Sequence, residues 1–232
     1  MTMTIFQFAL LKGLRNPLTM IFNCILPLAL VVVRPLWTGE NFLSGFGLLL
    51  LVIWGGSFLM TQGTINDRES GAITRILSAP ISMRNYLTQN LLAYMVPLTV
   101  QVALIAILGS ILYGWSLTLA FGIFLCYTVF TVASVTMSFA WNCLFKSKES
   151  SFASFSAMVT FGSMLSGAWI PLDNLPAVLQ HLGAIFPAYW GMRGIDSLVE
   201  LGSMSTDYWI GLGAMALFAI AFLLYGGKRR MI

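Results

Sequence analysis

The sequence predicts an all-α membrane protein with six transmembrane helices, an N-terminal interfacial helix and an outer re-entrant helical segment between spans five and six. Hydrophobic residues make up 58% of the 232 residues and charged residues only 9%, whereas soluble domains usually carry about 25% charged residues. No charged residue occurs between Arg84 and Lys146. As one helix this stretch would be roughly 90 Å long, about three bilayer cores, so it holds at least two spans.

The six spans are hydrophobic runs near or above the ~20 residues that cross a hydrocarbon core. Pro27 interrupts the first run, and Gly114-Trp115-Ser116 is the natural turn between the third and the fourth. The predicted spans are Leu18–Val33, Phe42–Thr64, Tyr86–Leu112, Leu117–Phe145, Phe152–Ile170 and Tyr208–Gly227. We therefore expect residues 1–232 to form a single transmembrane domain.

The N-terminal segment is apolar but too short to cross. Met3–Leu14 contains Lys12 and is followed by Arg15 and then by Asn16-Pro17, which stops a helix. Residues 1–16 therefore fit an amphipathic helix that lies in the cytoplasmic interface.

A second short segment lies between the last two spans. Leu175–Phe186 has helical spacing of its apolar residues, but about a dozen helical residues reach only ~18 Å. We expect it to be a re-entrant or interfacial helix, closed by Pro187 and followed by a second short piece around Tyr189–Val199. Residues 171–200 would together form this outer element.

Orientation follows from the distribution of lysine and arginine, which favour cytoplasmic loops. With the N-terminus inside, the opposite face receives only Arg34 and Arg193. The cytoplasmic face receives Lys12, Arg15, Arg68, Arg75, Arg84, Lys146, Lys148, Lys228, Arg229 and Arg230. Both termini are therefore expected in the cytoplasm.

The predicted spans carry no Asp, Glu, Lys, Arg or His near their centres, which argues against ion-coupled transport and intramembrane catalysis. Their uncharged polar residues either bridge helices by hydrogen bonds or line a path, and Gln101 is the most central of them. This set is Asn23, Gln62, Gln89, Asn90, Gln101 and Asn142. If the protein does work on a substrate, its energy comes from another chain.

Several other classes of function find no support. Cys24, Cys126 and Cys143 lie in hydrophobic runs without metal-ligand spacing, and His181 is the single histidine. We expect no metal site, no catalytic residue and no cofactor bound by this chain. The net charge of +4 sits in short clusters between apolar runs, so nucleic acid is not an expected partner.

The most informative hydrophilic segment is the loop of residues 65–85. Asp67–Leu77 can form a short helix with Asn66 as its N-cap, acidic residues in its first turn and Pro80 beyond its end. One interpretation is an ordinary cytoplasmic linker. The other is a docking helix for a soluble partner.

This loop resembles the corresponding stretch of ABC-2 type permeases, the membrane subunits of ATP-binding-cassette exporters. The matching residues are Glu69, Gly71, Leu77, Pro80, Ile81 and Ser82, with Ala72 where threonine is common. A second match begins at Ile170-Pro171-Leu172-Asp173-Asn174-Leu175-Pro176 and continues with Leu179, Phe186-Pro187 and Arg193-Gly194. The ordered combination of elements covers essentially the whole chain.

The resemblance implies a bacterial plasma-membrane permease that pairs with a second permease chain and docks a separate ATPase, because no Walker A sequence occurs here. ATP and Mg²⁺ would bind to that ATPase, and membrane lipids would surround the permease. The residues expected to couple it to the ATPase are Asp67, Arg68, Glu69, Gly71, Arg75, Leu77 and Pro80.

In this family the second and fifth spans also border the central path, where apolar and adaptable side chains would suit a hydrophobic drug, antibiotic or peptide. The candidate path residues are Trp54, Phe58, Gln101, Phe155, Met158 and Met164. Small residues of the fifth span would equally serve helix packing. The alternatives are a polysaccharide or lipid-linked glycan exporter, and an ATPase-independent channel or membrane scaffold.

Overall fold

The computed structural model describes residues 5–37, 42–71, 83–170 and 174–228, and all regular structure within these ranges is helical. The α-helices are α1 (Ile5–Arg15), α2 (Pro17–Met20), α3 (Leu26–Val32), α4 (Phe42–Thr61), α5 (Gly63–Glu69), α7 (Met83–Tyr113), α8 (Leu117–Asn142), α9 (Lys148–Leu165), α10 (Ala177–Gly183), α11 (Pro187–Leu201) and α12 (Thr206–Lys228). A π-helix, η1 (Ile21–Ile25), and a 3₁₀-helix, η2 (Arg34–Leu36), complete the set. The predicted all-α class is confirmed for these residues.

Four helical stretches in the described ranges are long and apolar enough to cross a membrane. They are Ser44–Glu69, Asn85–Tyr113, Leu117–Asn142 and Thr206–Gly226. A fifth crossing results if Ile5–Arg15 and Pro17–Val32, which meet at 82°, count as one span. α9 does not reach this criterion because its 18 residues begin with Lys148 and Glu149 and include several serines. The fifth predicted span, and with it the total of six, stays a prediction.

The first predicted span is continuous at Pro27 rather than broken there. Asn16 caps its start by accepting a hydrogen bond from the Leu18 N–H at 3.1 Å, and Pro17 occupies the first helical position. Pro27 would press on the carbonyl of Asn23 in a regular α-helix. The π-helix η1 lies immediately before Pro27, and its wider turn accommodates the ring without ending the helix.

The expected turn between the third and fourth spans is confirmed. α7 ends at Tyr113, and Gly114 has a φ of +66°, which a side-chain-bearing residue adopts only with strain. The Ser116 hydroxyl then accepts the Leu119 N–H at 3.2 Å and caps α8. Pro97 lies inside α7, where it cannot donate a hydrogen bond to the carbonyl of Ala93.

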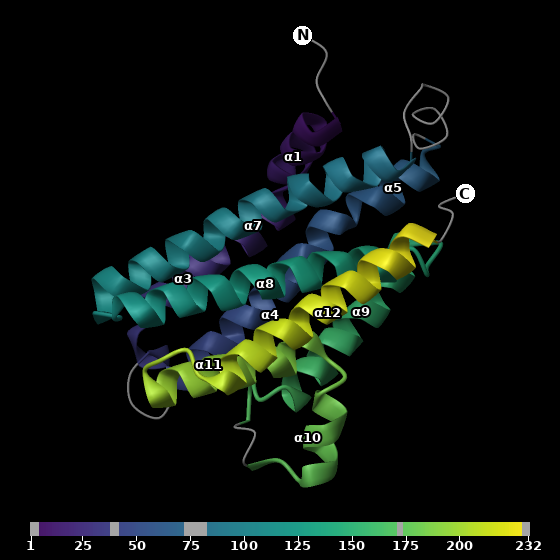
Figure 1. Cartoon of the computed structure of the whole chain (residues 1–232). Coiled ribbons are helices and arrows are strands. Elements are labelled where there is room, and N and C mark those ends of the chain that lie inside the picture. Colours follow the sequence, from purple (N-terminus) through teal and green to yellow (C-terminus); the bar gives the residue numbers. More distant parts are fainter. Residues whose placement is uncertain (1–4, 38–41, 72–82, 171–173, 229–232) are drawn as a thin grey trace.

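α8 is the central helix of the bundle. It packs against α12, α7, α4 and α11, and these elements surround it in Figure 1. Ile123, Tyr127 and Phe130 are fully buried along it. α8 carries no charged residue on any face. A helix that is hydrophobic all round is most stable when other helices enclose it, so the central position suits α8.

Tyrosine hydroxyls tie α8 and α7 to their neighbours. Tyr127 donates to the carbonyl of Phe46 at 2.8 Å, and Tyr208 donates to the carbonyl of Gly122 at 2.7 Å. Tyr113 donates to the carbonyl of Val31 at 2.6 Å. Each bond gives a buried polar group a partner that lipid cannot supply.

α10 and α11 form the segment expected at the outer side. α10 covers only Ala177–Gly183, and Pro187 begins α11 rather than only ending the helix before it. This agrees with the preference of proline for the first helical position, where no N–H is needed. α11 packs along α12, α8 and α4 and ends at Gly202, whose φ is +62°. α10 lies at the end of the bundle away from α1 and α5 (Figure 1).

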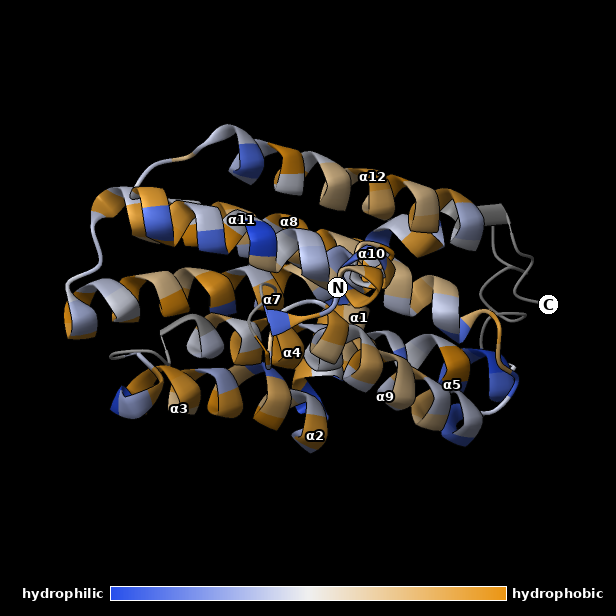
Figure 2. Ribbon diagram, turned by 90° about the horizontal axis from the view of Figure 1, so that it is seen from below, coloured by the Kyte–Doolittle hydropathy of each residue, from blue (hydrophilic) through white to orange (hydrophobic). Residues whose placement is uncertain are grey.

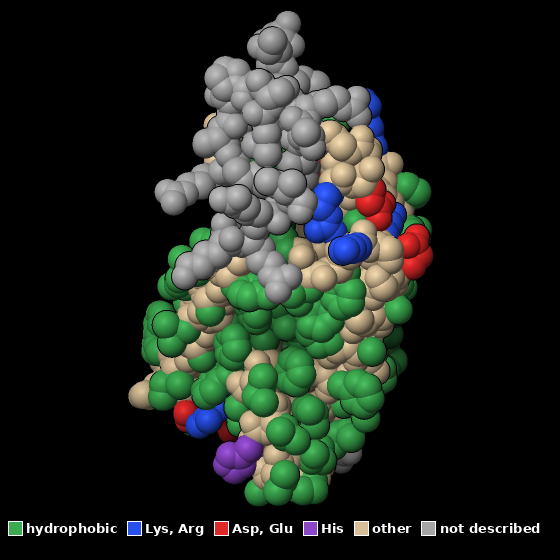
Figure 3. Space-filling view, turned by 90° about the vertical axis from the view of Figure 1, so that its right-hand side faces the viewer, with side chains coloured by type: hydrophobic (Ala, Val, Ile, Leu, Met, Phe, Trp, Pro, Cys, Tyr) green, Lys and Arg blue, Asp and Glu red, His purple; other side chains and the backbone are tan. Residues whose placement is uncertain are grey.

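Polar residues concentrate toward the ends of the bundle. Figure 2 shows hydrophobic residues along α7, α8 and α12 and a hydrophilic group around α5. The space-filling view in Figure 3 shows hydrophobic side chains over the middle of one face, with charged side chains near its two ends. This banding is what a membrane-embedded surface requires.

Candidate functional site

The coupling segment begins as an extension of α4. α5 follows α4 after a one-residue break at Gln62 and ends at Glu69, with Ser70 as its C-cap. The predicted start of a helix at Asp67 with Asn66 as N-cap is therefore wrong, because Asn66 lies inside α5. Residues 72–77 of the predicted helix lie outside the described residues. The helix of the second span simply runs on past the predicted start. Gly71 then turns with a φ of +67°, a conformation typical of the residue after a helix.

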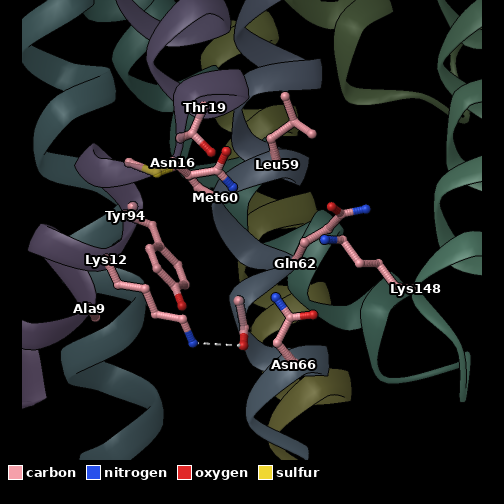
Figure 4. Close-up of a pocket in the computed structure, with 12 residues that line it drawn as sticks. Ala9, Lys12, Asn16, Thr19, Leu59, Met60, Gln62, Asn66, Tyr94 and Lys148 are labelled. Carbon is pink, nitrogen blue, oxygen red and sulfur yellow. Dashed lines mark hydrogen bonds between the residues drawn. The ribbon is translucent and has the colours of Figure 1, made fainter. Parts of the chain in front are cut away.

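Asp67 joins three helices through its two carboxylate oxygens. Oδ1 forms an ion pair with the Nζ of Lys12 in α1. Oδ2 accepts a hydrogen bond from the Tyr86 hydroxyl of α7 at 3.0 Å. Lys12 Nζ also lies 3.5 Å from the Gly63 carbonyl, the contact drawn in Figure 4. A displacement of α5 would therefore be transmitted to both α1 and α7.

A second set of contacts fastens the same end of the bundle to α8 and α9. The guanidinium of Arg68 donates to the carbonyl of Phe145, just beyond α8. The Asn142 amide donates to Thr61 Oγ1 at 3.0 Å, and its carbonyl oxygen accepts from Ser151 Oγ at 2.7 Å. Asn142 thereby connects α8 to α4 and α9, the helix-bridging role expected for polar residues of the spans.

A small polar pocket lies inside this junction. Figure 4 shows Lys12, Gln62, Asn66 and Lys148 converging on it from α1, from the α4–α5 junction and from the start of α9. Glu69 and Ser70, at the end of α5, are exposed. The other predicted coupling residues, Arg75, Leu77 and Pro80, lie outside the described residues. Sequence reasoning missed Tyr86, because a tyrosine at the start of a predicted span is also typical of a membrane interface.

Aromatic residues of the predicted path come together between α4 and α9. The rings of Phe58 and Phe155 stack with centroids 4.0 Å apart and an interplanar angle of 11°. Trp54 meets Phe155 edge-on at 6.5 Å. Phe58 and Phe155 border a cavity of about 240 Å³ between α4, α9 and the helix of the first predicted span. Leu18, Phe22, Leu51, Gly55, Leu59, Phe152, Ser156, Val159 and Thr160 line the rest of it.

The remaining predicted path residues lie elsewhere. Trp54 is fully buried and packs on Phe130 and Phe186 as well, so it supports the wall from behind. Met158 packs partly buried against the main core, and Met164 is 44% exposed. Gln101 faces a different hollow, formed with α1 and α3.

The first-span contribution to the cavity was missed from the sequence. Leu18 and Phe22 are four residues apart, so they share a helix face, but nothing local in the sequence shows which helix that face meets. Gly55 opposes Phe22, and a Cβ on Gly55 would lie 3.6 Å from that ring. On α9 the spacing is more informative, because Phe152, Phe155, Ser156, Val159 and Thr160 fall on one face by helical periodicity.

Membrane-crossing helices, an apolar cavity and a charged helical junction at one end define a helical membrane protein of the multi-pass class. The model of the ABC-2 family transporter proteins matches residues 38–227, and the chain belongs to this family. It is an ABC-2 type transporter permease and a multi-pass protein of the plasma membrane.

A curated relative points in the same direction. The chain is 24% identical over 188 residues to the linearmycin resistance permease protein LnrN of Bacillus subtilis (strain 168). The match covers 80% of this chain and 48% of the relative, so the chain spans about half the length of that protein.

Proposed function

We propose that this chain is the permease subunit of an ATP-driven exporter, which moves a hydrophobic drug, antibiotic or peptide-like substrate out across the plasma membrane. A separate ATPase subunit would dock on α5 and the loop that follows it, and would bind ATP and Mg²⁺. The observation that carries the proposal is the attachment of α5 to α1 and α7 through Asp67, in a chain of the ABC-2 family.

The coupling step follows from this attachment. α5 continues α4 almost directly, and α4 carries Phe58 at the cavity. A push on α5 by the closing ATPase would therefore shift one cavity wall along its own axis. Asp67 is partly buried and contacts both Lys12 of α1 and Tyr86 of α7. α1 and α7 are therefore expected to move with α5.

The chemistry of the cavity supports an apolar substrate. Its walls are aromatic and aliphatic, and among the described residues that line it only Ser156 and Thr160 carry polar side-chain groups. Thr160 already donates to the Ser156 carbonyl at 2.9 Å. Sites for drug-sized ligands usually have about 300–1,000 Å³, so the 240 Å³ of one chain is a part of such a site. A second permease chain would supply the other part.

The name of the Bacillus relative, a linearmycin resistance permease, adds support for an antibiotic as substrate. The position of the charged residues supports cytoplasmic placement of α1, α5 and both termini, because basic residues favour that side.

The direct test is capture of the ATPase. The tagged full-length chain is isolated from its native membranes in mild detergent, and co-purifying proteins are identified by mass spectrometry. We expect a soluble subunit with Walker motifs, and we expect Glu69→Ala with Gly71→Ala to abolish its recovery. Glu200→Ala is the matched control, because Glu200 is an exposed carboxylate on α11, away from the junction. Recovery of the folded permease without any ATPase would reject the proposal.

A further inference from the structure

One hydroxyl group in the wall of the aromatic cavity has no hydrogen-bond partner among the described residues. Ser156 lies on the face of α9 that lines this cavity, together with Phe152, Phe155 and Val159. Its backbone carbonyl accepts the hydroxyl of Thr160, but its own Oγ makes no such contact. The side chain is partly exposed and its Oγ is not enclosed by other atoms. The Ser156 hydroxyl is therefore available to a molecule in the cavity.

Other hydroxyl groups of the same helix behave differently. Ser154, Thr160 and Ser163 each donate to the backbone carbonyl four residues earlier, at 2.7, 2.9 and 2.6 Å. This is the usual way in which serine and threonine inside a helix satisfy their hydroxyl groups. The carbonyl of Phe152 stands in the same relation to Ser156, yet Ser156 does not donate to it. Ser156 thus keeps both its donor and its acceptor capacity free toward the cavity.

The surroundings of this hydroxyl are apolar. Ser156 lies about two turns, or about 12 Å, beyond Lys148 at the charged start of α9. Leu18 and Phe152, which also line the cavity, are 58% and 50% exposed, so the cavity opens on an apolar surface. A hydroxyl group without a partner in such surroundings costs free energy. A ligand that brings one hydrogen-bonding group to Ser156 recovers that cost.

The rest of the wall restricts the chemistry of that ligand. No Lys, Arg, Asp, Glu or His is among the described residues that line the cavity, so an ionic group would find no counter-charge. The stacked rings of Phe58 and Phe155 offer a surface for a flat apolar body. Thr160 has already committed its proton to the helix backbone. Ser156 is therefore the side chain of this wall that can donate to a neutral oxygen of the ligand.

We propose that Ser156 is a specificity-determining residue of the cavity. It selects apolar aromatic substrates that carry one neutral hydroxyl or carbonyl group over the matching hydrocarbons. The Ser156 hydroxyl donates to the oxygen of that group, and the apolar body of the substrate lies against Phe58 and Phe155. The hydrogen bond fixes which end of the substrate points toward α9. This inference rests on the proposed function, because it takes the cavity as part of the substrate path.

The test compares two fluorescent probes, pyrenebutanol and pentylpyrene, which differ only in a hydroxyl against a methyl group. Each is titrated into the full-length chain in mild detergent, and the saturable part of the energy transfer from tryptophan to pyrene reports binding. The wild type should bind pyrenebutanol about 3- to 10-fold more tightly than pentylpyrene, the usual worth of one hydrogen bond.

Two variants locate the origin of this preference. Ser156→Ala should bind both probes equally and should keep the affinity of the wild type for pentylpyrene. Thr160→Val is the matched control, because it removes a hydroxyl of the same wall that is already paired with the backbone. It should retain the preference for pyrenebutanol.

The outcomes separate this inference from the proposed function. Equal affinity of the wild type for the two probes would overturn the role of Ser156 and leave the apolar path intact. A preference that persists in Ser156→Ala would overturn it too, and so would a loss of both probes in that variant, which would indicate a structural role. If neither probe binds saturably, the cavity itself is rejected as a site for such molecules. Capture of the ATPase remains a separate test of the proposed function.

Discussion

At the scale of single residues, Asp67 is the side chain that connects α5 to both α1 and α7. Its carboxylate accepts from Lys12 on one oxygen and from Tyr86 on the other. The pair with Lys12 is only partly exposed, with side-chain exposures of 36% for lysine and 18% for aspartate. Exposed ion pairs contribute about 0–1 kcal/mol, and shielding from water places this one toward the upper end of that range or above it.

The Lys12–Asp67 interaction can be measured by a double-mutant cycle with Lys12→Met and Asp67→Asn. We expect an interaction energy of about 1 kcal/mol or more in the free energy of unfolding. The matched control is Arg193 and Asp207, an exposed pair at 3.0 Å, where about 0.5 kcal/mol or less is expected. Equal values for the two cycles would remove Asp67 as a mechanical link.

Gly71 makes a second prediction at this scale. Its φ of +67° is costly for any residue with a Cβ, so Gly71→Ala should lose about 1–2 kcal/mol or re-route the loop. Gly71→Asn should retain more ATPase binding than Gly71→Ala, since asparagine tolerates this conformation better. Gly213→Ala, at an exposed helical glycine with nothing within 4 Å, is the control. Co-purification of the ATPase measures all three variants, and equal loss for Ala and Asn would contradict the conformational explanation.

At the scale of elements, α4 and α9 act together because their aromatic faces meet. Phe58 and Phe155 stack, and Trp54 supports them from the buried side. α4 also approaches other elements very closely, since a Cβ on Gly47 would lie 2.4 Å from the Ala168 carbonyl oxygen. α4 is thus both a packing surface for the core and one wall of the cavity.

The face of α9 that meets α4 should therefore decide substrate preference. Phe155→Ala removes the ring that stacks on Phe58 and enlarges the cavity, so the ranking of transported hydrophobic compounds should change. Phe161→Ala, on the same helix but 66% exposed, should leave that ranking unchanged. Resistance of cells to a panel of apolar antibiotics, at matched membrane levels of the chain, measures the effect. Unchanged transport of every compound by Phe155→Ala would remove this residue from the path.

The turn between α7 and α8 depends on another close approach. A Cβ on Gly109 would lie 2.1 Å from the Trp115 ring, and that ring packs on Trp37 and Phe46. Gly109→Ala should therefore cost about 1–3 kcal/mol, the usual penalty of overpacking. Thermal unfolding measures it. If the double substitution Gly109→Ala with Trp115→Leu restores thermal stability, the Trp115 ring is the cause of the loss. An unchanged unfolding temperature for Gly109→Ala alone would contradict the prediction and show that the turn can shift to accommodate a Cβ.

At the scale of the whole molecule, the bundle has two unlike ends. One carries α1, α5 and the Lys12–Asp67 junction, and the other carries α10 (Figure 1). The exposed Glu69 and Asp207 mark the expected inner and outer sides.

Labelling with a membrane-impermeant maleimide tests this orientation. In a chain whose Cys24, Cys126 and Cys143 are replaced by alanine, Asp207→Cys should react in intact cells. Glu69→Cys should react only after permeabilisation. The reverse pattern would invert the topology and place α5 out of reach of any cytoplasmic ATPase.

The long membrane-spanning helices were the features that the sequence predicted best. The long charge-free runs place α4, α7, α8 and α12 within a few residues of their observed bounds, because backbone in lipid must form helices. Local signals were less decisive where tertiary packing competes with them. Asn66 suggested a helix start, yet the helix that begins in α4 resumes and continues through it. Gln101 and Phe155 fell into separate hollows, because sequence patterns assign a residue to a helix but not to a particular neighbour.

The position of α1 links two otherwise separate regions. Leu10 and Leu14 of α1 border the hollow that Gln101 also lines, and Lys12, between them in sequence, holds Asp67. A shift of α1 would therefore reach α5 through this ion pair, so the depth at which this short helix sits in the bilayer surface would also set the position of α5.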